Sequence, residues 1–254
     1  MAPRSIWNGT IAFGLVAVPI KVYSATESKT VRFREVHVKD ASPIEHRRIC
    51  PKEGKEIDKD HIVKGYEVKK GEWVELTDDE LAAAAGSQSR LIDVDHFVPA
   101  SEIDPVFYEK TYYLGAGDDG DEAYALLQAA LERADRAAVG RWVFHNRERT
   151  VIVRPLDGVL ALHTMRFADE IADPSDFKLG RVQRKPSAKE IKMASSLVDG
   201  LHTRFKPSDY KDQYRKAVLK LIDRKASGKE IEPPEDEQPE ESDDLLGALE
   251  ASLK

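Results

Sequence analysis

The sequence predicts a mainly β fold with some helices, built around a closed or nearly closed β-barrel. Most of the first two-thirds of the chain consists of short segments that are rich in apolar and β-branched residues and are separated by polar turns. Few segments between them are helical, and helical character increases after Pro186. Many short strands with few helices favour a barrel, because closing the sheet removes its exposed edges.

The strands can be assigned in order along the chain. Four segments in the N-terminal part have strand character, namely residues 13–18, 20–23, 30–38 and 73–76. In the third of these, Arg32 and Arg34 occupy alternate positions and are expected to face the same side of the strand. The clearest sheet is a three-stranded antiparallel meander of residues 142–144, 151–153 and 159–162, with turns at 145–148 and 157–158.

The helices are fewer. Residues 77–85 and 122–134 are expected to be helical, and in the second of them Tyr124, Leu127 and Leu131 share one stripe.

Beyond Pro186 the sequence predicts two amphipathic helices. Ser187 and Glu190 have capping-box spacing at the start of the first, and Pro207 starts the second. The apolar stripes run through Ile191, Ala194, Val198, Leu201 and Phe205 in the first helix and through Tyr210, Tyr214, Val218 and Leu221 in the second. Two helices of this size cannot bury both stripes against each other alone, so they should pack on the barrel or on a partner.

Charge is unevenly distributed along the chain. The net charge is −7, yet residues 230–254 alone carry ten acidic side chains against the single Lys254. Residues 28–70 have 12 basic and 8 acidic side chains, residues 186–229 have 11 and 5, and residues 71–125 have 14 acidic ones against two basic ones. The negative net charge of the whole chain argues against a nucleic acid partner, but the two basic regions could bind the phosphates of one. We divide the chain into a barrel region (1–185), a basic helical arm (186–229) and an acidic tail (230–254).

The tail is predicted to be a disordered linker that ends in a short docking peptide. Pro233, Pro234 and Pro239 lie among acids, a composition that cannot form a core. Asp243 and Asp244 precede leucines that repeat every four residues, and acids at this end suit a helix dipole. We expect the segment to dock as a helix into a partner's groove through Leu245, Leu246, Leu249 and Leu253.

Composition favours a cytoplasmic protein. The lone Cys50 excludes an intramolecular disulfide framework, and the reducing cytosol is the simplest compartment for such a chain. The apolar stretch between Arg4 and Lys21 is about 16 residues, too short to span a bilayer. It continues into strand-like residues without a cleavage site, so we interpret it as mature structure and expect no membrane association.

Motifs that could carry chemistry are weak. Residues 115–120 match G-x-G-x-x-G between a strand and a helix, which is the context of a dinucleotide site. Asp118 and Asp119 would repel a pyrophosphate there, so we prefer an acidic loop before a helix. A loosely spaced set of residues could bind zinc, namely Cys50, His46 and His61 with Asp58 or Asp60. We prefer to interpret them as exposed loop residues.

The remaining catalytic signatures are missing from the sequence. It contains no nucleophile elbow, no Walker A loop and no H-E-x-x-H motif. We therefore expect a protein that is not an enzyme and that uses no cofactor and no metal. Trp7, Trp73 and Trp142 lie among aliphatic strand residues, which predicts core positions rather than stacking platforms for bases.

Clustered basic side chains are the stronger functional signal. Together they supply many phosphate contacts and few Asn/Gln-rich elements that read bases, which predicts sequence-independent binding to a nucleic acid backbone. The predicted DNA-binding residues are Arg32, Arg34, Arg47, Arg48, Lys52, Lys64, Lys69, Lys70, Arg147 and Arg149.

Several segments resemble the bacterial Ku family, the DNA-end-binding clamps of non-homologous end joining. Residues 6–16 (Ile-Trp-Asn-Gly-Thr-Ile-Ala-Phe-Gly-Leu-Val) and 19–23 look like the first barrel strands of that family. Later landmarks are similar and occur in the same order, at Val63–Glu67, Trp73–Leu81, Tyr112–Leu114, Gly140–Val143 and Met165–Glu170.

The resemblance implies a Ku-type β-barrel core whose bridging loops form a dimeric ring around a duplex end, followed by a helical C-terminal arm. It also implies three partners: double-stranded DNA ends, a second copy of the chain, and the ATP-dependent DNA ligase D, recruited through the C-terminus. Some members of the family end in a long lysine-rich tail that adds DNA affinity. Here the tail is short and acidic, and we expect it to stay off the DNA.

Two other function classes stay open at this point. The basic arms could bind an acidic protein, which would make the chain a scaffold or adaptor without DNA affinity. The glycine loop could serve a dinucleotide-dependent oxidoreductase. The preferred interpretation is a non-enzymatic homodimeric clamp on DNA ends.

Overall fold

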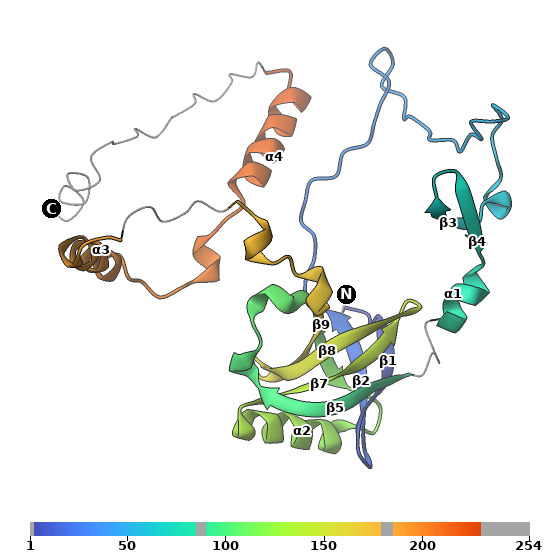
Figure 1. Cartoon of the computed structure of the whole chain (residues 1–254). Helices are drawn as coiled ribbons and strands as arrows, with labels where there is room; N and C mark the ends of the chain where they lie inside the picture. Colours follow the sequence, from blue (N-terminus) through green and yellow to red (C-terminus); the bar gives the residue numbers. More distant parts are fainter. Residues whose placement is uncertain (1–2, 85–89, 179–184, 230–254) are drawn as a thin grey trace. The chain divides into compact units, whose positions relative to one another are not determined.

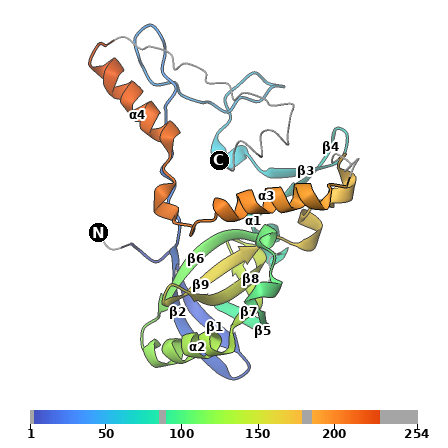
Figure 2. The same ribbon diagram turned by 90° about the vertical axis from the view of Figure 1, so that its left-hand side faces the viewer.

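The computed structural model describes residues 3–84, 90–178 and 185–229. The chain forms two compact units, one of Met1–Ser28 with Val36–Asp173 and the other of Lys29–Glu35 with Pro174–Lys254. Figures 1 and 2 show the elements of both units.

The first unit contains the predicted closed barrel, with seven strands among the described residues (Figure 1). The strands are β1 (Trp7–Phe13), β2 (Val16–Ser24), β5 (Leu91–Pro99), β6 (Tyr108–Ala116), β7 (Arg136–Phe144), β8 (Arg147–Leu156) and β9 (Val159–Met165). They close in the order β1-β2-β6-β9-β8-β7-β5. The closing pair, β1 with β5, is parallel, and the other neighbours are antiparallel.

The predicted meander is confirmed as β7, β8 and β9. The first turn is tighter than expected, and the second lies at 157–158 as predicted. Each has two central residues with positive φ: His145 (53°) with Asn146 (58°), and Asp157 (49°) with Gly158 (80°). Positive φ at both central residues is the geometry of a type I′ hairpin turn, whose twist matches that of the flanking strands.

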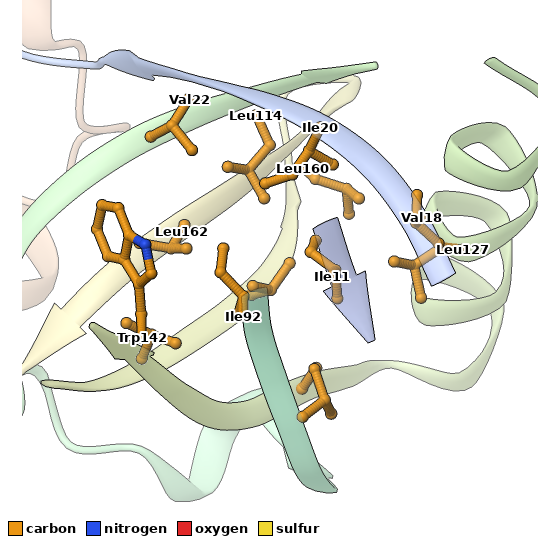
Figure 3. Close-up of a cluster of buried hydrophobic side chains, with 14 of the residues drawn as sticks. Ile11, Val18, Ile20, Val22, Ile92, Leu114, Leu127, Trp142, Leu160 and Leu162 are labelled. Carbon is orange, nitrogen blue, oxygen red and sulfur yellow. The ribbon is translucent and has the colours of Figure 1, made fainter. Parts of the chain in front are cut away.

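Apolar side chains from alternate strand positions fill the barrel (Figure 3). Trp142 is fully buried, stacks on Phe144 at 4.3 Å between ring centroids and meets the edge of Trp7 at 5.5 Å. Helix α2 (Asp121–Ala134) lies across one end of the barrel in both views and adds Leu127 and Leu131 to the core (Figures 1 and 2). The prediction of a helix at 122–134 is thereby confirmed.

A smaller sheet and a short helix connect β2 to β5. The sheet is the hairpin of β3 (Lys64–Lys69) and β4 (Glu72–Leu76), and α1 (Asp78–Ala84) follows it. The core position predicted for Trp73 is wrong, because this residue is 61% exposed. A two-stranded hairpin buries little surface unless another layer covers it.

The strand predicted over residues 30–38 is also wrong. Residues 29–35 have no regular structure, and Val36 forms one isolated bridge with Pro43. The β-propensity of this segment does not suffice, because a strand needs a hydrogen-bonded neighbour. Arg32 and Arg34 therefore do not share the face of a strand.

The second unit contains α3 (Ala188–Gly200) and α4 (Gln213–Ala226). The predicted capping box is present: the amide of Glu190 donates to Ser187 Oγ at 3.3 Å, and the amide of Ser187 donates to Glu190 Oε2 at 2.6 Å. The second helix begins later than predicted, since Asp212 caps it by accepting from the amide of Arg215 at 2.8 Å. Phe205 and Tyr210 lie outside both helices, because Pro207 starts only a 3-10 turn.

The remaining short elements are 3-10 turns. Within the described ranges they are Lys59–His61, Ala100–Glu102, Pro105–Phe107, Ala168–Glu170, Pro174–Asp176 and Pro207–Asp209. No helix in the described part of the chain is long and apolar enough to cross a membrane.

A buried histidine stabilises the outer face of the barrel. Leu160 and Leu162 point into the core, so His163 points outward, where it is only 5% exposed. Arg154 Nε donates to His163 Nε2 at 3.1 Å, which leaves the imidazole proton on Nδ1, 3.0 Å from Thr111 Oγ1. Burial, followed by the charge of Arg154, lowers the pKa of His163 to about 4.

His163 is therefore expected to make the barrel less stable at mildly acidic pH. The unfolded chain binds a proton near pH 6.5 and the folded chain near pH 4, so this contribution is complete above pH 6.5 and is lost as the pH falls toward 4. At pH 5 the loss is about 2 kcal/mol relative to pH 7.5. Urea unfolding followed by tryptophan fluorescence measures it, and His163→Gln should remove most of this pH dependence. An equal pH dependence in both proteins would contradict the assignment.

Candidate nucleic-acid interface

Three adjoining grooves lie in the first unit, and the β7–β8 turn lines two of them. The first, of about 390 Å³, is lined by Arg90 and by His145 and Asn146 of the turn. The second, of about 410 Å³, shares these two turn residues and adds Lys64 and Arg147. The third, of about 640 Å³, shares Lys64 and extends the surface further. We call their cationic side chains the basic groove residues: Arg48, Lys59, Lys64, Arg90 and Arg147.

The basic groove residues differ in how far they are already neutralised. Lys64 Nζ lies 2.8 Å from Asp78 Oδ1, and its hydrogen bond and charge lower the pKa of Asp78. Arg147 lies 3.6 Å from Glu170. In the described ranges, Arg48, Lys59 and Arg90 form no ion pair. These three cations are free to meet a phosphate without first giving up a carboxylate.

A compact loop positions Arg48. Ile49 and Glu56 form an isolated bridge, and the amide of Cys50 donates to the carbonyl of Lys55 at 2.9 Å. Arg47 lies within ion-pair distance of Glu56 (3.2 Å) and Glu45 (3.8 Å). The loop therefore uses Arg47 to close on itself and leaves Arg48 in the groove. Lys52 is exposed in the turn between the paired segments.

The other predicted residues do not line these grooves. Lys69 and Lys70 lie at the turn between β3 and β4. Arg149 lies within the barrel wall and forms an ion pair with Glu109 at 2.9 Å. Arg32 and Arg34 are exposed residues of the second unit.

The structure thus brings together three of the predicted DNA-binding residues, Arg48, Lys64 and Arg147. It adds Lys59 and Arg90, which are not among the predicted residues. Lys59 could have been found, since it lies within the basic region 28–70. Arg90 is an isolated cation in the acidic region 71–125, and folding alone places it beside the β7–β8 turn.

The glycine motif at 115–120 has a packing role. A Cβ atom on Gly117 would lie 2.8 Å from the Pro19 backbone, and one on Gly120 would lie 2.8 Å from the Pro19 carbonyl oxygen. The loop is fixed by an ion pair between Lys21 and Asp118 and by a hydrogen bond from the amide of Gly117 to the carbonyl of Pro19. These glycines let the loop approach β2 closely, which accounts for the motif without a nucleotide.

The zinc alternative gains no geometric support. Among the residues that the structure describes, no three His, Cys, Asp or Glu side chains gather into a metal-binding group, and this includes Cys50, His46 and His61. The docking residues predicted in the tail, Leu245, Leu246, Leu249 and Leu253, lie outside the described residues.

Comparison with known proteins identifies the barrel. Residues 12–193 match the family model described as Ku: Ku70/Ku80 beta-barrel domain. The chain belongs to the Ku family. It is 43% identical over 252 residues to the non-homologous end joining protein Ku of Anaeromyxobacter sp. (strain K), a match that covers 98% of this chain and 85% of that one.

Other relatives are similar over the same extent. The non-homologous end joining protein Ku of Mycobacterium tuberculosis is 38% identical over 262 residues, which cover 99% of this chain and 95% of that one. The protein of that name from Heliobacterium modesticaldum is 39% identical, with 100% and 92% covered. The basic groove residues all lie within the range that matches the Ku barrel domain.

Proposed function

We propose that this protein is a non-enzymatic, homodimeric clamp that binds double-stranded DNA ends independently of sequence. The duplex threads through a basic ring, and the clamp recruits and stimulates the end-joining ligase D during repair of double-strand breaks. The observation that carries the proposal is the continuous set of basic groove residues in a barrel of the Ku family. The relatives' names, which refer to non-homologous end joining, support the same process.

The electrostatics favour contacts to the DNA backbone. Lysine and arginine side chains in a groove bind phosphates and release counterions, and such contacts carry no base information. Enclosure of the duplex would retain it without base contacts, so a modest positive charge suffices if it lines the ring. We place the protein in the cytoplasm, on broken DNA.

Exposed apolar side chains support a dimer. No residue of α3 or α4 is buried, and Val198, Leu201 and Tyr214 are each about 70% exposed or more. In the first unit, Tyr66 on the β3–β4 hairpin is also exposed, as is Trp73. Soluble proteins rarely leave such sets of large apolar side chains in water, so they are suited to contacts with a second subunit.

Reversing charges in the grooves tests the proposal. Arg48→Glu and Lys59→Glu change exposed residues that form no ion pair with the described part of the chain, so the fold should be unaffected. Each should weaken binding to a linear duplex and reduce the slope of log K against log salt by about 1, and the double variant by about 2. Fluorescence anisotropy across a salt series measures both quantities, with retained dimerisation checked by sedimentation.

The matched control is Arg133→Glu on α2, a helix that lines none of the three grooves. It changes net charge by the same amount and should leave the slope unchanged. Arg32→Glu with Arg34→Glu examines the second unit in the same assay: weaker end binding would support a place for these arginines in the ring, and unchanged binding would put them outside it. If wild-type protein showed no DNA affinity at low salt but still oligomerised, the adaptor function would replace the clamp.

A further inference from the structure

An apolar groove runs along α2 on the outside of the barrel. It has a volume of about 590 Å³ and is lined by Phe13 and Val16 of the β1–β2 hairpin, Phe97 of β5, and Leu126, Ala130 and Ala134 of α2. Leu126 is 72% exposed, Val16 45% and Phe97 43%. Such a cluster of large apolar side chains marks a surface that another segment covers.

The shape of the groove fits a helix that carries leucines at intervals of four residues. Leu126, Ala130 and Ala134 repeat every four residues along α2, and the two alanines leave holes between larger neighbours. Leu245, Leu249 and Leu253 repeat with the same spacing in the sequence. Four residues of α-helix rise about 6 Å, so leucines of a helical partner would meet these positions in register.

Charge fixes the direction of such a pairing. The beginning of α2 carries Asp121 and Glu122, and its end carries Arg133, followed by Arg136 at the groove. The terminal segment has the same arrangement, with acids at positions 243 and 244 and a lysine at position 254. Antiparallel packing places opposite charges together at both ends and also pairs the two helix dipoles favourably.

We propose that this groove binds the chain's own terminal segment, residues 243–253, as a helix antiparallel to α2. Thirteen residues, 230–242, separate Lys229 from Asp243, a tether that reaches up to about 45 Å. Docking would cover the leucines. Ligase binding by the same leucines rests on the proposed function. If they bind the ligase, the groove and the ligase compete for them, and the docked segment is not accessible to the ligase.

Cysteine trapping in the full chain tests this docking. Cys50→Ser removes the single native cysteine. Ala130→Cys is then combined with Ala248→Cys and oxidised with glutathione. The matched control combines Ala248→Cys with Ala129→Cys, a position that is equally exposed on α2 but does not line the groove. Facing helices bring such cysteines within disulfide range, so the groove pair should form the bond at least about tenfold faster than the control pair.

Three outcomes are informative. Faster disulfide formation at position 130 than at position 129 supports docking if Leu249→Asp slows it. The mass of the product tells whether both cysteines come from one chain. Equal trapping at 129 and 130 would overturn it. A dominant disulfide between two copies of position 130 would also overturn it, since it would mean that two barrels pack groove to groove. The assay contains neither DNA nor ligase, so its failure is distinct from failure of the clamp function.

Discussion

A linear duplex should compete for this protein about a hundredfold better than the same duplex closed into a covalent circle. The proposed ring can be entered only from an end. On a closed circle the duplex can touch the outside of the protein or one open face, so most of the phosphate contacts around the duplex are lost. A mobility-shift experiment with a labelled linear fragment and unlabelled competitors of both forms measures the ratio.

The control uses the same DNA molecule. Cutting the circle once with a restriction enzyme adds two ends without changing its sequence, and this should convert it into a strong competitor. If circle and cut circle competed equally, the protein would bind DNA along its side and the threading hypothesis would be wrong. Loss of the preference in Arg48→Glu with Lys59→Glu would connect it to the basic groove residues.

Removing residues 243–254 should abolish stimulation of the ligase while leaving DNA-end binding unchanged. The segment contains the predicted docking leucines and lies beyond a stretch of acidic and proline residues that is unsuited to contact with DNA. Ligation of linear fragments by ligase D, with and without this protein, measures the stimulation.

A point variant separates the leucines from the acids. Leu249→Asp together with Leu253→Asp should lose stimulation as the deletion does, whereas Asp243→Asn with Asp244→Asn should retain most of it, because apolar anchors supply the affinity of a helix-in-groove contact. Undiminished stimulation by the deleted protein would refute the docking role of the tail. Weaker DNA binding after deletion would show that the acidic tail contributes to the clamp itself.

The sequence alone determined the elements whose signals are local. The meander of β7–β9 follows from alternating residues and short turns, α2 from its apolar stripe, and the start of α3 from Ser187 and Glu190. In each case, contacts within or between consecutive segments suffice to specify the structure. The resemblance of several segments to the Ku family is also recognisable from the sequence alone, and the family match confirms it.

The errors arose where a segment depends on a distant or absent neighbour. Residues 30–38 have strand-like composition, but in the described structure they form only an isolated bridge at Val36. Trp73 lies among aliphatic residues in the sequence but is 61% exposed in the fold. Tyr210 fits the stripe of the following helix, yet Asp212 caps that helix two residues later. The pattern of side chains along a segment does not show which other segments pack against it in the folded protein.

The basic grooves show the same division between sequence and tertiary structure. Local composition identifies 28–70 as a basic region but does not distinguish among its lysines and arginines. The fold distinguishes them. Arg47 is paired with Glu45 and Glu56, and Arg149 with Glu109. Arg48 and Lys59 share a groove with Lys64, which adjoins the grooves that Arg90 and Arg147 line at the β7–β8 turn. The sequence determined how much charge is available. Only the tertiary structure decided which charges gather, because pairing between segments that are far apart in the chain, such as β5 with β7, brings Arg90 beside the β7–β8 turn.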